Sequence, residues 1–255
     1  MGRALLQGAI AAGVVDPQRL TVVDPDANSQ AWWTREIPAA QVTEDCRAGV
    51  TRGEIVILAV KPQTLGAVAA TPADWDQRLT ISVAAGIQLA QLQSQFGTQR
   101  IVRVMPNTPS LIAAGAAAFC CGPQVTAADA EAVERLFTAV GLVARVPEHQ
   151  MDAVTAVSGS GPAYVFLIIE ALADGGVAAG LPRDLALRLA TQTVAGAAQL
   201  VRETGEHPGA LKDAVASPGG TTIAGLHSLD QNAVRGAMID AVQAAARRSR
   251  ELGSG

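Results

Sequence analysis

The stretch that decides the fold is residues 54–62, Glu-Ile-Val-Ile-Leu-Ala-Val-Lys-Pro. A short apolar run that ends at a charge and a proline is typical of a strand buried on both faces of a parallel sheet. Similar runs occupy residues 20–23, 79–83 and 100–104, with helix-length segments between them. Strands alternating with helices predict an α/β fold with a mostly parallel sheet.

The pattern continues to Pro147 and then changes. Residues 115–120 and 141–146 are expected to be strands flanking a helix at 126–140, which Thr126 and Asp129 would cap. Beyond Pro147 only helices are expected: one opening at Ser160-Gly161-Pro162, one ending at Gly205, and one capped by Asp230 and ending near Gly253. We therefore predict an α/β domain at residues 1–147 and an all-α domain at residues 148–255.

The composition excludes several classes of function. A net charge of −4 provides no basic field for nucleic acid or an anionic membrane surface. The three cysteines have no metal-ligand spacing, so we expect no metal site, and their odd count suits a reducing compartment. No uninterrupted apolar run reaches the ~20 residues of a membrane span. We expect a cytoplasmic protein with no nucleic-acid or membrane partner.

The sequence contains no GxGxxG, the glycine turn that brings a dinucleotide pyrophosphate onto a helix N-terminus. It opens directly as a helix with Leu5, Leu6 and Ile10 on one face. The next predicted strand ends at Asp24. That aspartate has two readings, a local turn residue or the acidic residue that holds the ribose hydroxyls of NAD.

The segment with the strongest chemical signal is residues 206–222, which contains Ser217-Pro218-Gly219-Gly220-Thr221-Thr222 before an apolar helix. Consecutive N–H groups at a glycine-rich helix start form an anion-binding nest. The alternative is that Ser217 and the two threonines only cap the helix. A small carboxylate or phosphate site explains the two glycines and two threonines better than a cap.

Two further segments follow predicted strands. Lys61 is one of only two lysines among 19 basic residues, and it lies at the carboxyl edge of the sheet, where open α/β folds bind ligands. A solvated charge at a strand end is the alternative. Residues 103–109, Arg-Val-Met-Pro-Asn-Thr-Pro, form a proline-stiffened loop at the same edge. Both segments are candidates for cofactor contacts.

The helices after Pro162 are apolar around much of their circumference, with Glu170 as the only charge in residues 163–172. A helix of this kind must be buried on several sides. A bundle of about one hundred residues cannot easily bury it alone. We therefore expect an obligate homodimer through the C-terminal helices, with a higher oligomer left open.

At this point the motifs identify a family. Five motifs resemble those of pyrroline-5-carboxylate reductases, in that family's order and over essentially the whole chain. They are residues 59–63 (AVKPQ), 82–87 (SVAAGI), 104–109 (VMPNTP), 158–164 (SGSGPAY) and 207–222. Residues 1–6 resemble the start of the family's first helix, which follows a first strand and a GxGNMG turn. Met1 matches the methionine of that turn.

The resemblance implies a Rossmann-like, mostly parallel sheet domain that lacks its first strand, followed by an all-α dimerisation domain. It implies reduction of Δ1-pyrroline-5-carboxylate to L-proline with NADPH or NADH, the last step of proline biosynthesis. The implied catalytic residue is Thr222, at the substrate's ring nitrogen. The implied substrate-binding residues are Glu206, Ser217, Gly219, Gly220, Thr221 and Thr222. The implied cofactor-binding residues are Met1, Gly2, Asp24, Cys46, Val60, Lys61, Pro62, Ala85 and Asn107.

Some positions depart from the family pattern, and other functions stay open. Asp24 and Cys46 stand where some members carry neutral or amide side chains near the adenosine 2′-phosphate. A carboxylate there would repel that phosphate, so NADH is expected to be usable as well as NADPH. One alternative is a β-hydroxyacid-type dehydrogenase, but the helix after Pro162 lacks the lysine such enzymes carry. Another is a catalytically impaired or non-catalytic dimeric relative that has lost the pyrophosphate-binding turn.

Overall fold

A computed structural model describes residues 1–253, which form two compact units. The first unit contains residues 1–160 together with the end of the chain from Ala244, and the second contains residues 161–243. The first unit thus extends past the predicted boundary at residue 147, because the helical turns at 148–160 pack on the sheet domain.

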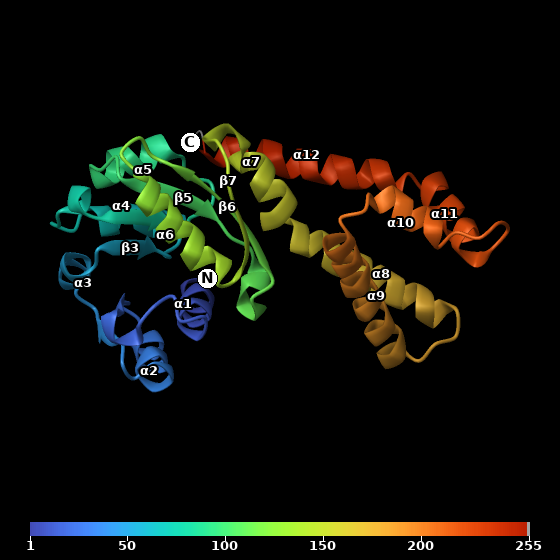
Figure 1. Ribbon diagram of the computed structural model, residues 1–255, viewed down its shortest axis with the longest axis horizontal. Helices are drawn as coiled ribbons and strands as arrows, with labels where there is room; N and C mark the ends of the chain where they lie inside the picture. Colours follow the sequence, from blue (N-terminus) through green and yellow to red (C-terminus); the bar gives the residue numbers. More distant parts are fainter. Residues whose placement is uncertain (254–255) are drawn as a thin grey trace. The chain divides into compact units, whose positions relative to one another are not determined.

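The first unit holds seven strands in two separate sheets (Figure 1). The larger sheet has the order β3 (Ile55–Leu58), β4 (Leu79–Ser82), β5 (Ile101–Met105), β6 (Gly115–Cys121) and β7 (Gly141–Arg145). All its neighbours are parallel except β5 and β6. The smaller sheet pairs β1 (Thr21–Val23) with β2 (Gln41–Thr43) in parallel. Six of these strands confirm predicted ones, and β2 was not predicted.

Helices cover both faces of the larger sheet. One face is covered by α1 (Gly2–Ala11) and α6 (Ala127–Thr138), around a core that includes Leu5, Phe119 and Phe137. The other face is covered by α3 (Cys46–Arg52), α4 (Leu65–Ala69), α5 (Leu89–Phe96) and α7 (Met151–Val154). Between β1 and β2 runs α2 (Ala27–Glu36). Alternate residues of each strand reach opposite cores, as a sheet buried on both faces requires.

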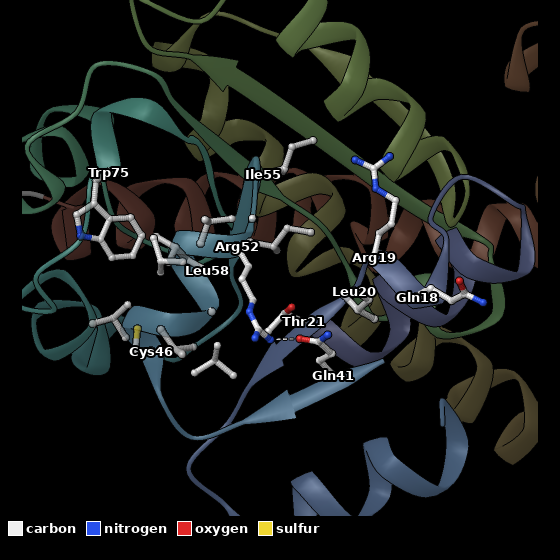
Figure 2. A pocket seen from close by; sticks show the side chains of 18 residues that line it. Gln18, Arg19, Leu20, Thr21, Gln41, Cys46, Arg52, Ile55, Leu58 and Trp75 are labelled. Carbon is white, nitrogen blue, oxygen red and sulfur yellow. Dashed lines mark hydrogen bonds between the residues drawn. The ribbon is translucent and has the colours of Figure 1, made fainter. Parts of the chain in front are cut away.

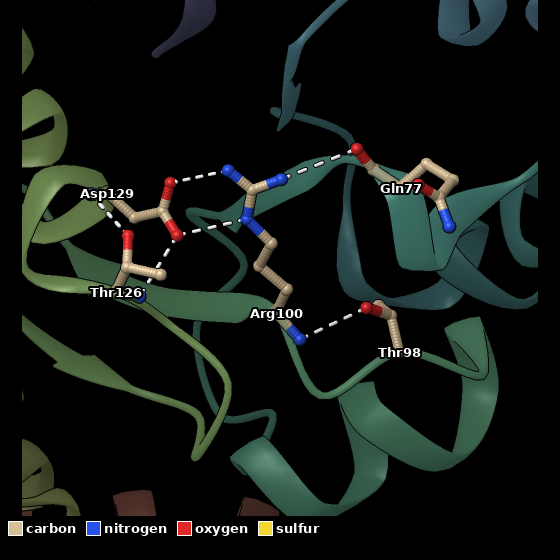
Figure 3. Close-up of polar contacts among 5 residues, drawn as sticks. All are labelled: Gln77, Thr98, Arg100, Thr126 and Asp129. Atoms are coloured by element: carbon tan, nitrogen blue, oxygen red, sulfur yellow. Dashed lines mark hydrogen bonds and ion pairs between the residues drawn. The ribbon is translucent and has the colours of Figure 1, made fainter.

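The start of α6 is fixed by the predicted capping box (Figure 3). Thr126 Oγ1 accepts from the Asp129 N–H at 3.1 Å, and the Asp129 carboxylate accepts from the Thr126 N–H at 3.0 Å. Arg100 donates to both oxygens of that carboxylate, at 2.7 and 3.0 Å. The bond from Arg100 lowers the pKa of Asp129 to about 2. These contacts join the N-terminus of α6 to Arg100, the residue directly before β5.

The second unit is all-α. It comprises α8 (Gly161–Ala178), α9 (Arg183–Thr204), α10 (Pro208–Ala214), α11 (Thr221–Gln231) and the first half of α12 (Val234–Gly253). Its buried core is small, consisting of Ala173, Ala186 and Ala190 where α8 packs on α9. Large apolar side chains of α8 are exposed instead: Phe166 by 63%, Leu167 by 65% and Leu172 by 50%.

The helical stretch at residues 148–178 is, by length and composition alone, long and apolar enough to cross a membrane. The sequence contains no uninterrupted apolar run of this length, so the stretch becomes evident only when consecutive helical segments are taken together. Few of its side chains are buried in the single chain. An apolar surface of this kind also suits a protein–protein interface.

One predicted helix start is wrong. Asp230 does not cap the final helix but lies in the last turn of α11, where its carbonyl accepts from the Ala233 N–H at 3.0 Å. Ala233 adopts a left-handed conformation with φ of 51°, and α12 begins after it at Val234. The break therefore comes from a backbone turn rather than from a side-chain cap. The helix continues through Gly253, the last residue that the structure describes, so its predicted end lies at the limit of the described residues.

Candidate active site

The Ser217–Thr222 segment forms a tight turn that leads into α11. Gly219 has φ of +67°, and the Gly220 N–H donates to the Ser217 carbonyl at 3.0 Å. The positive φ favours glycine at 219, while a Cβ at Gly220 would lie 2.2 Å from Ser217 Oγ and would require that side chain to move. Gly220 is the N-cap residue, and no side chain caps the helix. The alternative in which Ser217 and the threonines serve as caps is therefore wrong.

Because α11 has no side-chain cap, its first N–H groups have no partner within the helix. The first hydrogen bond inside α11 is from Ala224 N to Gly220 O at 3.3 Å, which leaves the N–H groups of Thr221 and Thr222 available. Free N–H groups and the positive end of the helix dipole attract an anion. The half-buried Thr222 adds a hydroxyl at the same end. This turn can therefore bind a carboxylate and hold a hydroxyl beside it.

Glu206 lies in the loop between α9 and α10, where its N–H donates to Thr204 Oγ1 at 3.2 Å. Its exposed carboxylate makes no hydrogen bond or ion pair within residues 1–253. The next residue, His207, caps α10 through Nδ1, which accepts from the Gly209 N–H at 3.0 Å. Lys212 is paired with the adjacent Asp213. Of these side chains, only Glu206 is left free for a ligand.

The predicted cofactor residues of the first unit follow the carboxyl ends of its strands. Asp24 follows β1, Val60 and Lys61 come after β3, and Ala85 follows β4. Parallel strands bring these ends to one edge of the sheet, where open α/β folds bind ligands. Lys61 is exposed and has no ion pair within the described chain, and Pro62 begins a short 3₁₀ turn after it.

Around Asp24, a polar chain joins three elements. Ser29 Oγ donates to Asp24 Oδ2 at 2.6 Å and accepts from Arg3 Nη2 at 2.8 Å. The Arg3 guanidinium also lies over the Trp32 ring, 4.4 Å from its centroid. Asp24 Oδ1 accepts from the Asp26 N–H at 3.0 Å, which is the turn contact expected locally. The same carboxylate is thus a turn residue and an acceptor at the carboxyl end of β1.

The N-terminus of α1 lies at this edge as well. A Cβ placed on Gly2 would be 3.0 Å from the Ala59 Cβ, so helix and strand end approach as closely as glycine permits. Met1 is exposed and gives no side-chain cap, and the first helical bond is from Leu5 N to Met1 O at 3.1 Å. The free N–H groups before Leu5, together with Asp24 and Lys61, fit the ribose and a phosphate of a dinucleotide.

Two predicted cofactor residues have structural contacts. Asn107 is buried, and its amide bridges two elements: Oδ1 accepts from the Ala116 N–H at 2.9 Å, and Nδ2 donates to the Ser158 carbonyl at 3.1 Å. Cys46 is the first residue of α3 and is half-buried beside a cavity between β1 and β3 (Figure 2).

Sequence reasoning missed an ion pair between the buried Arg103 of β5 and the half-buried Glu148. Arg103 is 5% exposed and lies 3.5 Å from Glu148, whose Oε1 also accepts from the Leu89 N–H at 2.6 Å. Burial, with a smaller contribution from Glu148, raises the pKa of the nearby Cys120 thiol to about 12. That thiol stays protonated at neutral pH and is no nucleophile. An arginine inside a predicted strand was the one signal that could have revealed the pair.

Comparison with known proteins gives two matches to family profiles. Residues 148–252 match the profile described as "Pyrroline-5-carboxylate reductase dimerisation". Residues 1–86 match the profile described as "NADP oxidoreductase coenzyme F420-dependent".

Individual relatives match along the whole chain. Pyrroline-5-carboxylate reductase of Arabidopsis thaliana is 48% identical over 255 residues, which cover 99% of this chain and 92% of that protein. The solved structure of the Coxiella burnetii reductase is 35% identical with a TM-score of 0.91, covering 99% of this chain and 94% of that one. The Plasmodium falciparum reductase, solved with NADP bound, is 33% identical with a TM-score of 0.87 and the same coverages. The chain belongs to the pyrroline-5-carboxylate reductase family.

Proposed function

We propose that this protein reduces Δ1-pyrroline-5-carboxylate to L-proline with NADH or NADPH, the last step of proline biosynthesis. The observation that carries this is the uncapped start of α11, where free N–H groups and the Thr222 hydroxyl meet. The substrate has the matching groups, a carboxylate and a ring nitrogen. Family membership favours this activity over a non-catalytic relative.

Different residues of the turn bind different groups of the substrate. The free N–H groups of Thr221 and Thr222, with the Ser217 hydroxyl, hold the substrate carboxylate at the positive end of α11, and the turn at Gly219 and Gly220 lets the substrate approach them. The Thr222 hydroxyl hydrogen-bonds the ring nitrogen and fixes the plane of the imine. Glu206 contributes a negative charge that favours the protonated, more electrophilic imine. Binding and orientation are the protein's contribution to the rate.

The cofactor, when bound, supplies a hydride from its nicotinamide ring to the imine carbon. In this chain the N-terminus of α1, with Met1 and Gly2, faces a phosphate, and Asp24 holds the ribose hydroxyls. Lys61 contributes positive charge at the same sheet edge. The cofactor also contacts five further residues in this proposal: Cys46, Val60, Pro62, Ala85 and Asn107.

We also propose an obligate homodimer built through the helical domain. The support is the exposed apolar face of α8, with Phe166 and Leu167 each more than 60% exposed, and the match to a dimerisation profile. The functional division at residues 1–147 and 148–255 follows the same profile, which begins at residue 148. The odd cysteine count and the free thiols of Cys46, Cys120 and Cys121 support a reducing, cytoplasmic setting.

The test of the substrate site is Thr222→Ala, assayed by oxidation of NADH and NADPH with pyrroline-5-carboxylate. Loss of a hydrogen bond to a charged ring nitrogen is expected to lower kcat/KM roughly 10- to 100-fold, and Thr222→Ser should recover most of it. Thr191→Ala, which removes an exposed hydroxyl bonded to the Leu187 carbonyl, is the matched control and should change nothing. Full activity in Thr222→Ala would refute the role. An absence of turnover in the unaltered protein would refute the proposed function.

A further inference from the structure

The α12 end, residues 249–253, belongs to the first unit and is fixed there by a polar contact. Ser249 is 5% exposed, and its Oγ donates to Asp152 Oδ1 at 2.6 Å. Asp152 lies in α7, next to Met151, which is fully buried in the core on one face of the larger sheet. A hydrogen bond to a carboxylate is one of the stronger kinds in proteins. The α12 end is therefore docked on a well-packed part of the first unit.

The α12 end also packs on the β4–α5 loop, residues 83–88. A Cβ placed on Gly253 would lie 3.3 Å from the Gly86 carbonyl oxygen and 3.3 Å from Gln88 Nε2. A Cβ placed on Gly86 would lie 3.4 Å from the Leu252 Cβ. Gly86 is buried although it lies in a loop. These contacts show that the last turn of α12 lies directly against the loop at Gly86.

Both ends of the β4–α5 loop are held by contacts that do not involve α12. The Val83 N–H donates to the Leu58 carbonyl of β3 at 3.2 Å, which continues the pairing of the sheet. At the other end, the N–H of Leu89, the first residue of α5, donates to Glu148 Oε1 at 2.6 Å. The ends of the loop would therefore keep their places if the α12 end moved away.

The middle of the loop has no such contacts. Within residues 1–253, the N–H groups of Ala85, Gly86 and Ile87 donate no well-formed hydrogen bond. Gly86 has φ of +76°, and a glycine changes its backbone conformation more easily than any other residue. Packing must therefore determine the conformation here, and the α12 end supplies that packing at Gly86.

The position of Ala85 connects this packing to cofactor binding. Ala85 is exposed and follows the carboxyl end of β4, at the edge of the sheet where open α/β folds bind ligands. The peptide unit that joins it to Gly86 contains the Ala85 carbonyl and the Gly86 N–H, so a shift of Gly86 moves both groups. A loop that is ordered before a ligand arrives loses less conformational entropy on binding.

We propose that Ser249 is a positioning residue for the cofactor. Its hydrogen bond to Asp152 docks the α12 end, and the docked turn keeps the β4–α5 loop in the conformation that contacts the nicotinamide cofactor. This inference rests on the cofactor contact of Ala85 in the proposed function. Ser249 has no part in binding the substrate, so cofactor affinity and substrate affinity should separate when the hydrogen bond is broken.

The test is Ser249→Glu, which places a second carboxylate against Asp152 and should undock the α12 end. Ordering one freed loop residue again costs roughly tenfold in an equilibrium constant. The Kd for NADH, measured from NADH fluorescence without substrate, should therefore rise at least 10-fold, and the KM for NADH should rise with it. The kcat at saturating NADH and the KM for pyrroline-5-carboxylate should stay within about twofold. Hydrogen exchange should be at least 10-fold faster at the amides of the α12 end and unchanged in β7.

A rescue and a control separate positioning from general damage. Asp152→Asn, added to Ser249→Glu, replaces the repulsion by a hydrogen bond and should restore most of the NADH affinity. Ser94→Glu adds the same charge at an exposed serine of α5 and should change nothing. Should Ser249→Glu fail to fold, Ser249→Ala removes only the hydroxyl and should raise the Kd for NADH roughly threefold.

Two results would overturn the proposal: faster exchange at the α12 end with an unchanged Kd for NADH, or a parallel loss of cofactor and substrate affinity. Because NADH binding is measured without turnover, the proposal is tested separately from the proposed function. An unaltered protein that binds NADH but does not reduce pyrroline-5-carboxylate would refute only the proposed function. An unaltered protein that binds no NADH would refute both.

Discussion

At the scale of single residues, we propose that Asp24 determines the preference between the two cofactors. Its carboxylate lies at the carboxyl end of β1 and accepts a hydrogen bond from Ser29 Oγ. The same Ser29 oxygen accepts a hydrogen bond from Arg3. A carboxylate there accepts from a ribose 2′-hydroxyl and repels a 2′-phosphate dianion. With Asp24 made neutral, Arg3 and Ser29 would be free to bind that phosphate.

We therefore expect Asp24→Ser to raise the ratio of kcat/KM for NADPH over NADH by at least tenfold, measured with both cofactors under the same conditions. Asp16→Ser is the control, because it removes the same charge from a surface turn in the same unit. If the unaltered protein strongly prefers NADPH, the assignment of Asp24 to the ribose hydroxyls is wrong.

Residue types in a fixed local pattern could be predicted from the sequence, and contacts over long distances could not. The turn at 217–222 depends on its own glycines, so its conformation follows from local chemistry. The Arg103–Glu148 pair joins residues far apart in the sequence, and neither has a local signal for the other. Asn107 was predicted as a ligand contact, while its bonds to Ala116 and Ser158 became evident only in three dimensions.

At the scale of elements, the start of α6 depends on one carboxylate. Asp129 has a pKa lowered to about 2 from its ordinary 3.8, because Arg100 and the capping box favour the charged form. A carboxyl with a lowered pKa in the folded state stabilises the protein fully above about pH 4. That stabilisation is lost as the pH falls through about 2, and the shift corresponds to about 2 kcal/mol at neutral pH.

Asp129→Asn should accordingly lower the free energy of unfolding by about 2 kcal/mol at pH 7, measured by urea denaturation. The difference from the unaltered protein should shrink as the pH falls from 4 toward 2. Asp76→Asn, at an exposed carboxylate that accepts only from neighbouring Gln77, should have little effect at any pH. A pH-independent loss in Asp129→Asn would show that packing, not charge, holds the start of α6.

Elements with strong periodicity or caps were predictable, and elements defined by their neighbours were not. The strands of the larger sheet read as apolar runs because both their faces are buried. β2 is Gln-Val-Thr, three residues with one apolar side chain, and it becomes a strand only by pairing with β1. The start of α12 was misplaced because Ala233, an ordinary helix former, adopts a left-handed turn just before it.

At the scale of the whole molecule, the helical domain cannot bury its own apolar surface. Phe166→Glu with Leu167→Glu should place two charges in the proposed interface and weaken dimerisation at least 100-fold, since each buried apolar side chain contributes about 1.5–3 kcal/mol. Light scattering should then show a monomer at micromolar concentration. Val14→Glu, at an exposed apolar residue of the first unit, should remain a dimer. A double variant with the unaltered mass would exclude this face as the interface.

The end of the chain has a consequence for synthesis on the ribosome. Ser249 Oγ donates to Asp152 Oδ1 at 2.6 Å, and residues from Ala244 belong to the first unit although the whole second unit is translated before them. The sheet domain therefore cannot reach its final state when its first 160 residues leave the exit tunnel. The last contact of the sheet domain therefore forms only after the helical domain has been synthesised, although the sheet and its two cores lie wholly within the first 160 residues.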